Sequence, residues 1–179
     1  PTSKYGLPGF EDLIHQLGES WLTRRDEINE SGEKILEHIR EASQNLAAAS
    51  ELNKEMLLKG AKQFKNGFDE EYGGFGESPK FPRPPGLNFL LRAYYRFEDS
   101  ESLQMVIRTL LQMARGGMYD HLGGGFHRYS VDRYWRVPHF EKMLYDQAQL
   151  IQSYLDAYQI TRDTVFADVA RETLDYIIR

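Results

Sequence analysis

A short element recurs along this chain, and its spacing constrains the fold more than any single helix does. Gly74-Phe75 and Gly125-Phe126 stand 51 residues apart, and each pair follows a predicted helix. Each pair then leads through an aromatic and basic loop to a proline at the start of an apolar helix. A helix, a long loop and a returning helix form an αα-hairpin. Recurrence near 50 residues therefore predicts a helical array or toroid.

Apolar residues recur at helical spacing in seven segments. Helices are expected over about 9–25 and 26–43, from Met56 to Asn66, from Leu87 through Tyr95, from Leu103 to Met113, over 139–159, and from about Thr161 onward. Two long irregular segments, 68–85 and 116–138, interrupt this pattern. The small and polar run at 44–53 is the expected domain boundary. The chain is therefore predicted to be all-α, built from αα-hairpin repeats.

Composition narrows the classes of function. Lys and Arg total 22 against 27 for Asp and Glu, and a net charge of −5 does not favour nucleic-acid binding. Without cysteine these residues hold no disulfide, thiolate metal site or cysteine nucleophile. Neither a run of about 20 apolar residues nor a signal peptide is present, so the expectation is a cytoplasmic protein that does not bind membranes. Because the chain begins at Pro1 and stops inside an apparently helical run, we expect a piece of something longer.

Residues 116–150 hold more chemically active side chains than any other stretch. His121, His127 and His139 lie there among several carboxylates and cations. Histidine titrates nearest neutrality, and nearby carboxylates can orient and tune it, so such a cluster can transfer protons. The alternative is a loop whose polar groups only satisfy one another. The same groups can ligate metals, but their spacing matches neither HxH nor HExxH, so no metal and no cofactor are predicted.

The same segment is rich in aromatic rings. Rings of this kind suit a pocket that stacks flat apolar faces, and carbohydrates present such faces. Tyr134 and Trp135 are expected to line this pocket, whereas Phe126 and Phe140 are expected to pack beneath the loop.

Charged residues near this segment have structural alternatives. Lys142 and Asp146 stand four residues apart at the start of a helix predicted to be buried, so they either pair or belong to the site. The other loop, YGGFGESPKFPRPP, lacks a GxxxxGK[ST] pattern and a preceding strand, which argues against a nucleotide site. Lys80 and Arg83 are expected at the same end of the helical assembly as the second loop, since equivalent loops of a repeat share one face.

Three motifs resemble those of spermatogenesis-associated protein 20 and its microbial relatives. They are FDEEYGGFGESPKFPRP, GGMYDHLGGGFHRYSVDRYWRVPHFEKMLYDQAQL and, less specifically, YGLPGF before a helix. Members of that family resemble a fusion of a thioredoxin-like domain with an (α/α)6 barrel of the six-hairpin glycosidase type. The resemblance implies that 1–46 are the closing helices of the thioredoxin-like domain, 47–51 a linker, and 52–179 the first hairpins of an incomplete barrel. The family's CxxC would lie before Pro1.

Barrels of this type are similar to sugar 2-epimerases, isomerases and glycosidases, which act through His, Glu or Asp in loops at one end of the toroid. By this analogy we expect a sugar-processing protein in which His127 or His139 is the general acid or base, with Glu141 or Asp132 as partner. An epimerase-like site would abstract a proton next to a carbonyl. A hydrolase-like site would instead place two carboxylates around a glycosidic bond.

The expected ligand is a carbohydrate or polyol, and the expected protein partner is the rest of the same polypeptide. The residues implied to bind the ligand are Lys80, Asp120, His121, Arg128, Tyr129, Trp135 and Asp146. The rival function is a non-catalytic binding or scaffold module that serves the attached thioredoxin-like domain.

Overall fold

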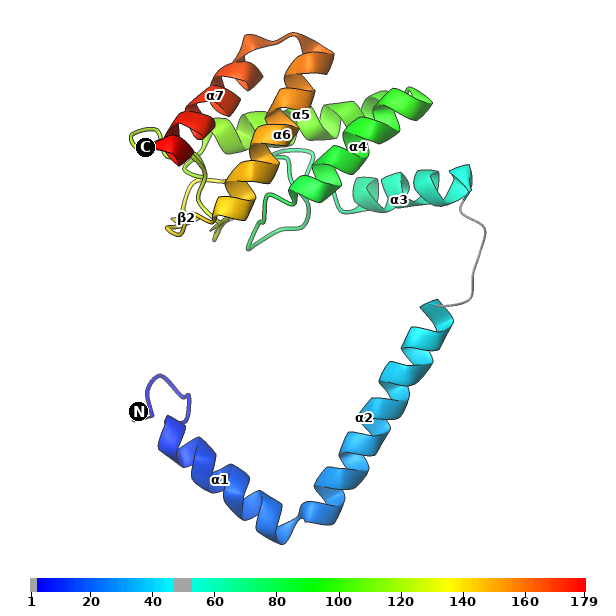
Figure 1. Cartoon of the computed structure of the whole chain (residues 1–179), viewed down its shortest axis with the longest axis vertical. Coiled ribbons are helices and arrows are strands. Elements are labelled where there is room, and N and C mark those ends of the chain that lie inside the picture. Colours follow the sequence, from blue (N-terminus) through cyan, green and yellow to red (C-terminus); the bar gives the residue numbers. More distant parts are fainter. Residues whose placement is uncertain (1–2, 47–52) are drawn as a thin grey trace. The chain divides into compact units, whose positions relative to one another are not determined.

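The computed structural model describes residues 3–46 and 53–179, which belong to two compact units (Figure 1). One unit spans Pro1–Glu51 and the other Leu52–Arg179. The linker expected at 47–51 lies outside the described residues. The described chain is mainly helical, as the sequence predicts, and none of its helices is both long enough and apolar enough to cross a membrane.

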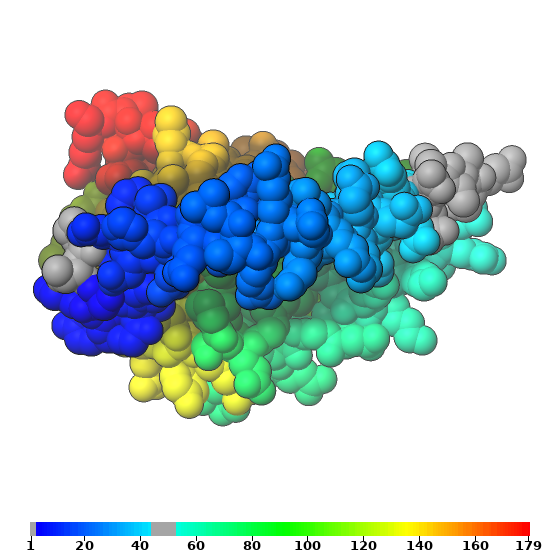
Figure 2. Space-filling view, turned by 90° about the horizontal axis from the view of Figure 1, so that it is seen from below, coloured from blue at the N-terminus to red at the C-terminus, as the bar shows by residue number. Residues whose placement is uncertain are grey.

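The first unit consists of two helices, α1 (Phe10–Thr23) and α2 (Arg25–Leu46). The carboxylate of Asp12 fixes the start of α1 by accepting hydrogen bonds from the Gly9 N–H and the Ser3 hydroxyl. No residue of α1 is buried, and apolar side chains on both helices are exposed, including Trp21 at 44% and Ile35 at 60%. Figure 2 shows these helices in blue.

The second unit holds five helices. They are α3 (Lys54–Asn66), α4 (Pro84–Phe97), α5 (Ser100–Arg115), α6 (Leu144–Thr161) and α7 (Thr164–Ile178). Pairs α4–α5 and α6–α7 are joined by two-residue connections, and each first helix ends on a left-handed residue, Glu98 or Arg162. Asp163 then caps α7 by accepting a hydrogen bond from the Val165 N–H. The unit is therefore a series of αα-hairpins, which confirms the predicted fold class.

The core of the second unit lies where the hairpins pack on one another. Leu87 and Leu90 of α4, Leu110 of α5 and Leu150 of α6 are fully buried. The ring of Tyr154 on α6 is also buried, and its hydroxyl donates to the Leu110 carbonyl oxygen at 2.7 Å. Each buried apolar side chain contributes about 1.5–3 kcal/mol relative to an exposed one, so this contact region fixes the positions from which the loops depart.

Long connections alternate with the short ones, and they contain the only strands of the described residues. The first loop (67–83) joins α3 to α4, and the second loop (116–143) joins α5 to α6. Within the second loop, β1 (Tyr129–Ser130) pairs antiparallel with β2 (Pro138–His139). One residue of this hairpin, His139, belongs to the helix predicted over 139–159, and α6 begins only at Leu144.

Candidate functional site

The two long loops form one continuous structure at the same end of the hairpins (Figure 1). Lys80 of the first loop pairs with Ser130 of β1 through two backbone hydrogen bonds of 2.8 Å, so the first loop extends the small sheet. The sequence predicts that equivalent loops share one face, and for these two loops the structure agrees.

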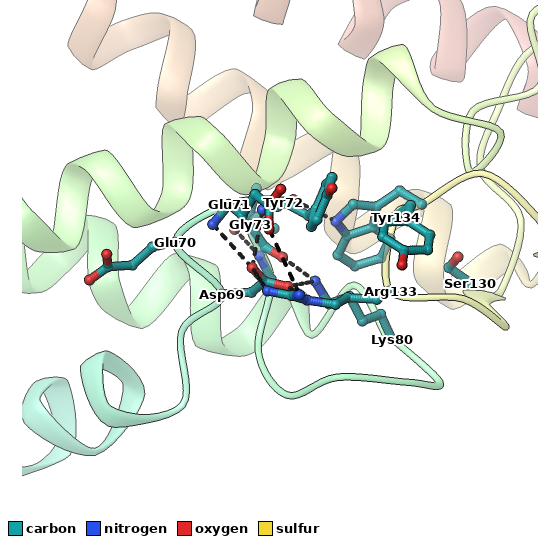
Figure 3. A network of polar contacts seen from close by, with 12 residues as sticks. Asp69, Glu70, Glu71, Tyr72, Gly73, Lys80, Ser130, Arg133 and Tyr134 are labelled. Carbon is teal, nitrogen blue, oxygen red and sulfur yellow. Dashed lines mark hydrogen bonds and ion pairs between the residues drawn. The ribbon is translucent and has the colours of Figure 1, made fainter.

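A buried carboxylate holds the first loop together (Figure 3). One oxygen of Asp69 accepts the backbone N–H groups of Glu71 and Tyr72, both at 3.1 Å. The other oxygen accepts Lys80 Nζ at 2.6 Å, and Lys80 also donates to the Gly73 carbonyl oxygen at 2.7 Å. Burial opposes ionisation of Asp69, but hydrogen bonds from Arg133 and Lys80 outweigh burial and hold the pKa of the carboxyl well below its usual value.

The second loop covers this carboxylate with an arginine and a tryptophan. Arg133 donates two hydrogen bonds to the Asp69 carboxylate, at 2.7 and 2.9 Å. The ring of Trp135 is fully buried, lies over the Lys80 ammonium, and donates its indole N–H to the Tyr72 carbonyl oxygen at 2.9 Å. Gly74 has a φ of +79°, and a Cβ there would overlap the indole ring, so only glycine fits.

The second loop repeats this arrangement at Asp120, 51 residues after Asp69. One oxygen of Asp120 accepts the backbone N–H groups of Leu122 and Gly123, and the other accepts Lys142 Nζ at 2.7 Å. Lys142 also donates to the Gly124 carbonyl oxygen at 2.7 Å, as Lys80 does to Gly73. The repeat visible in the sequence is therefore a repeat of bonding geometry. We call each Asp–Lys–Gly arrangement an aspartate frame.

Next to the frames, three stacked rings form a half-exposed platform. Tyr129 of β1 stacks between Phe81 and His139, with ring centroids 4.7 and 4.8 Å apart. Beside the platform, Arg128 donates to Glu141 at 2.8 Å, and Nδ1 of His139 lies 3.5 Å from the same carboxylate. The side chains of His139 and Glu141 are 43% and 46% exposed, so both reach solvent. The hydrogen bond from Arg128 lowers the pKa of Glu141 and keeps it ionised.

Two further titratable groups lie in the second loop and in the helix that follows it. His127 is 9% exposed, its ring meets Phe140 edge-on, and its Nδ1 has no hydrogen-bond partner in the structure. Burial, with a smaller effect of Lys142, lowers the pKa of His127. Asp146, in the first turn of α6, has a raised pKa because burial disfavours its charge, with Arg128 partly opposing the shift. A neutral histidine and a carboxyl with a raised pKa are groups suited to proton transfer.

The buried His127 predicts a pH-dependent stability. Because its pKa in the folded protein lies below the ordinary value of 6.5, the unfolded chain binds its proton more tightly. The stability that neutral His127 provides is therefore complete above about pH 6.5 and is lost as the pH falls toward the lowered pKa. Urea unfolding between pH 7 and pH 5 should show a smaller loss for His127→Gln than for the wild type. If the free energy of unfolding falls equally in the two proteins between pH 7 and pH 5, His127 does not have this role.

Apart from His127 and Asp146, the predicted site residues fall into two groups in the structure. Arg128, Tyr129, His139 and Glu141 lie together at the platform. The others hold loops: Lys80, Asp120 and Trp135 belong to the frames, His121 contacts the Gly116 carbonyl oxygen, and Asp132 accepts the backbone N–H groups of Tyr134, Arg136 and Val137. Burial of Asp132 raises its pKa, but these backbone donors outweigh that effect and lower it, as expected for a turn residue.

Several details of the predicted site differ in the structure. Lys142 precedes α6 and pairs with Asp120 rather than with Asp146. Phe140, expected beneath the loop, is 78% exposed, whereas Trp135, expected in an open pocket, is enclosed. The sequence reasoning missed Asp69 and Phe81. Asp69 had a usable signal, because it precedes Gly74-Phe75 by the same interval that separates Asp120 from Gly125-Phe126.

No metal centre emerges from the described part of the chain. Across 3–46 and 53–179, no three His, Asp or Glu side chains gather as a group that would hold an ion. The site therefore consists of aromatic rings, an ion pair and titratable side chains.

A helical unit of αα-hairpins with its long loops gathered at one end is the class of fold that these observations define. The chain is accordingly similar in fold to the cellobiose 2-epimerase of Bacillus thermoamylovorans, an (α/α)6 barrel, with a TM-score of 0.57 and 18% identity. That similarity covers 68% of this chain and 35% of the epimerase chain.

Sequence relatives give the family, although no family model matches the chain. Spermatogenesis-associated protein 20 of mouse is 41% identical, and its human counterpart 39%, in each case over 96% of this chain. The matched residues therefore belong to the spermatogenesis-associated protein 20 family, as their motifs predict. The chain spans 22% of the length of the mouse protein and 23% of the human one.

Proposed function

We propose that the second unit is part of a sugar-processing domain that binds a carbohydrate or polyol at the Phe81–Tyr129–His139 platform. The observation that carries this proposal is the platform itself, a ring stack beside an ion pair, both half-exposed. Rings stack on the apolar face of a sugar, while Arg128 and Glu141 offer a donor and an acceptor to its hydroxyl groups. The fold shared with a cellobiose 2-epimerase supports the sugar class.

The titratable groups supply the chemistry of this proposal. His139 is the general base or acid, and the ionised Glu141, 3.5 Å from its Nδ1, is its partner. His127, kept neutral by burial, is the second histidine of the site, and Asp146 is the carboxyl whose raised pKa suits proton donation. Asp132 is left as a turn residue.

Two reactions remain within this class. In an epimerase-like reaction, a histidine removes the proton next to the carbonyl of an opened sugar. In a glycosidase-like reaction, Glu141 and Asp146 flank the glycosidic bond.

We also propose that residues 1–46 close a thioredoxin-like domain, with 52–179 as the first hairpins of the barrel.

Sugar binding is tested with the intact protein and a panel of glucose, mannose, cellobiose and sorbitol. At least one compound should raise the melting temperature, and calorimetric affinity should fall at least tenfold in His139→Ala and in Glu141→Gln. Tyr95→Ala, which removes an exposed ring on α4, is the matched control and should bind normally. A flat response to all four compounds would favour the scaffold function instead.

The reaction is then tested in D2O with the compound that binds. Proton NMR should show either deuterium entering at C2, for the epimerase-like reaction, or released monosaccharide, for the glycosidase-like one. His139→Ala should reduce the rate by about 100-fold or more. Binding without turnover would leave a sugar-binding module and exclude catalysis.

A further inference from the structure

The two aspartate frames differ in how completely they are closed. The side chain of Asp69 is 3% exposed, whereas that of Asp120 is 28% exposed. Both carboxylates accept two backbone N–H groups and one lysine. Asp69 additionally accepts two hydrogen bonds from the guanidinium of Arg133. No arginine is bonded to Asp120 among the residues that the structure describes.

The open side of Asp120 faces a polar pocket. The pocket has a volume of about 220 Å³, and the charged and titratable residues of its lining are Asp120, His121, Glu172, Asp175 and Arg179. The Glu172 carboxylate accepts a hydrogen bond from the Tyr119 hydroxyl. Asp175 lies on the same turn of α7 as Glu172 and is exposed. Three carboxylates outnumber the two cations, Arg179 in the lining and Lys142 on Asp120, so the pocket stays negative and a further cation is its complementary occupant.

The connectivity of the first frame indicates where that cation comes from. Asp69 lies in the loop before the α4–α5 hairpin, and Arg133 lies in the loop after it. Asp120 lies in the loop before the α6–α7 hairpin, so the equivalent position is the loop after α7. The family relatives extend well beyond the matched length, since the chain covers 22–23% of them.

We propose that the Asp120 pocket binds an arginine side chain from the loop that follows α7 in the intact protein. This arginine closes the second frame as Arg133 closes the first, and in that way each hairpin is locked to the next. A guanidinium suits the place better than an ammonium, because its planar fork donates to both carboxylate oxygens at once. The pocket is thus an interface between hairpins, independent of sugar binding.

Carboxyl footprinting of the unmodified intact protein tests the proposal without a substitution. Carbodiimide with glycine ethyl ester should label Asp168, which lies outside the pocket and is 57% exposed, quickly, and should label Asp69 and Asp120 at least tenfold more slowly. Arginine footprinting with phenylglyoxal, read by peptide mass spectrometry, should show Arg133 and one arginine beyond residue 179 as slow. Labelling of Asp120 as fast as Asp168 would overturn the proposal.

Asp120→Asn identifies the arginine. This substitution keeps the acceptor for the Leu122 and Gly123 N–H groups but removes the charge, so one arginine beyond residue 179 should become at least fivefold more reactive to phenylglyoxal. Asp175→Asn, in the same pocket but outside the frame, is the control and should change no arginine by that amount. If only Arg179 at the pocket rim is unmasked, or no arginine at all, the proposed interface is wrong.

Discussion

Asp69→Asn is expected to lower the free energy of unfolding by about 3–5 kcal/mol, the usual cost of removing one partner from a buried ion pair. The asparagine amide would still accept the Glu71 and Tyr72 N–H groups, but the negative charge between Lys80 and Arg133 would be gone. Lys80 is fully enclosed, so water cannot replace the lost carboxylate as a partner of its ammonium group. Urea unfolding followed by circular dichroism measures the loss.

An exposed aspartate–arginine pair provides the matched control for Asp69. Asp168 pairs with Arg171 on α7 at 2.8 Å, and both side chains are more than half exposed. Asp168→Asn should cost less than about 1 kcal/mol, because exposed pairs contribute little. If Asp69→Asn costs no more than Asp168→Asn, the frame does not hold the loops together.

Trp135→Ala is expected to cost about 3–5 kcal/mol, the range for truncating a large buried ring. The substitution empties the space against Gly74, leaves the Tyr72 carbonyl oxygen without its indole donor, and removes the ring that covers Lys80. The shift of the urea midpoint at unchanged slope reports this loss.

The neighbouring ring serves as the control for Trp135. Tyr134 is 46% exposed and touches Tyr72 edge-on at 4.9 Å between ring centroids. Tyr134→Ala should cost about 1 kcal/mol or less, the size of one aromatic pair. Equal losses at the two positions would mean that Trp135 is not the closing element of the first frame.

The hairpin architecture was predictable from sequence because it depends on local signals. Apolar spacing marks the helices, and Gly-Phe pairs at a fixed interval mark the loops between them. The late start of α6 at Leu144 was not predictable in this way, because His139 pairs with β1 and residues 140–143 continue the loop. A two-residue strand has too few residues to show an alternating pattern.

The segment that holds the candidate site was predictable, but the direction of its side chains was not. Trp135 and Phe140 are both aromatic residues in one loop, yet one is enclosed and the other is exposed. Their directions depend on the register of the β1–β2 hairpin and on the contact between Asp69 and Arg133, which are 64 residues apart in sequence. Composition and spacing carry no information about such a distant contact.

The frames also differ in the length of chain that they enclose. Lys80 follows Asp69 by 11 residues and Lys142 follows Asp120 by 22, yet each ammonium occupies the same place on its carboxylate and glycine carbonyl. The 11 additional residues match the length of the segment from Tyr129 to His139, which carries two of the three platform rings. An insertion of this kind adds aromatic side chains to the loop without moving the two residues that anchor it. Family members are therefore expected to differ in the number of residues between the aspartate and the lysine of a frame. The aspartate and the lysine themselves are expected to be present in each member.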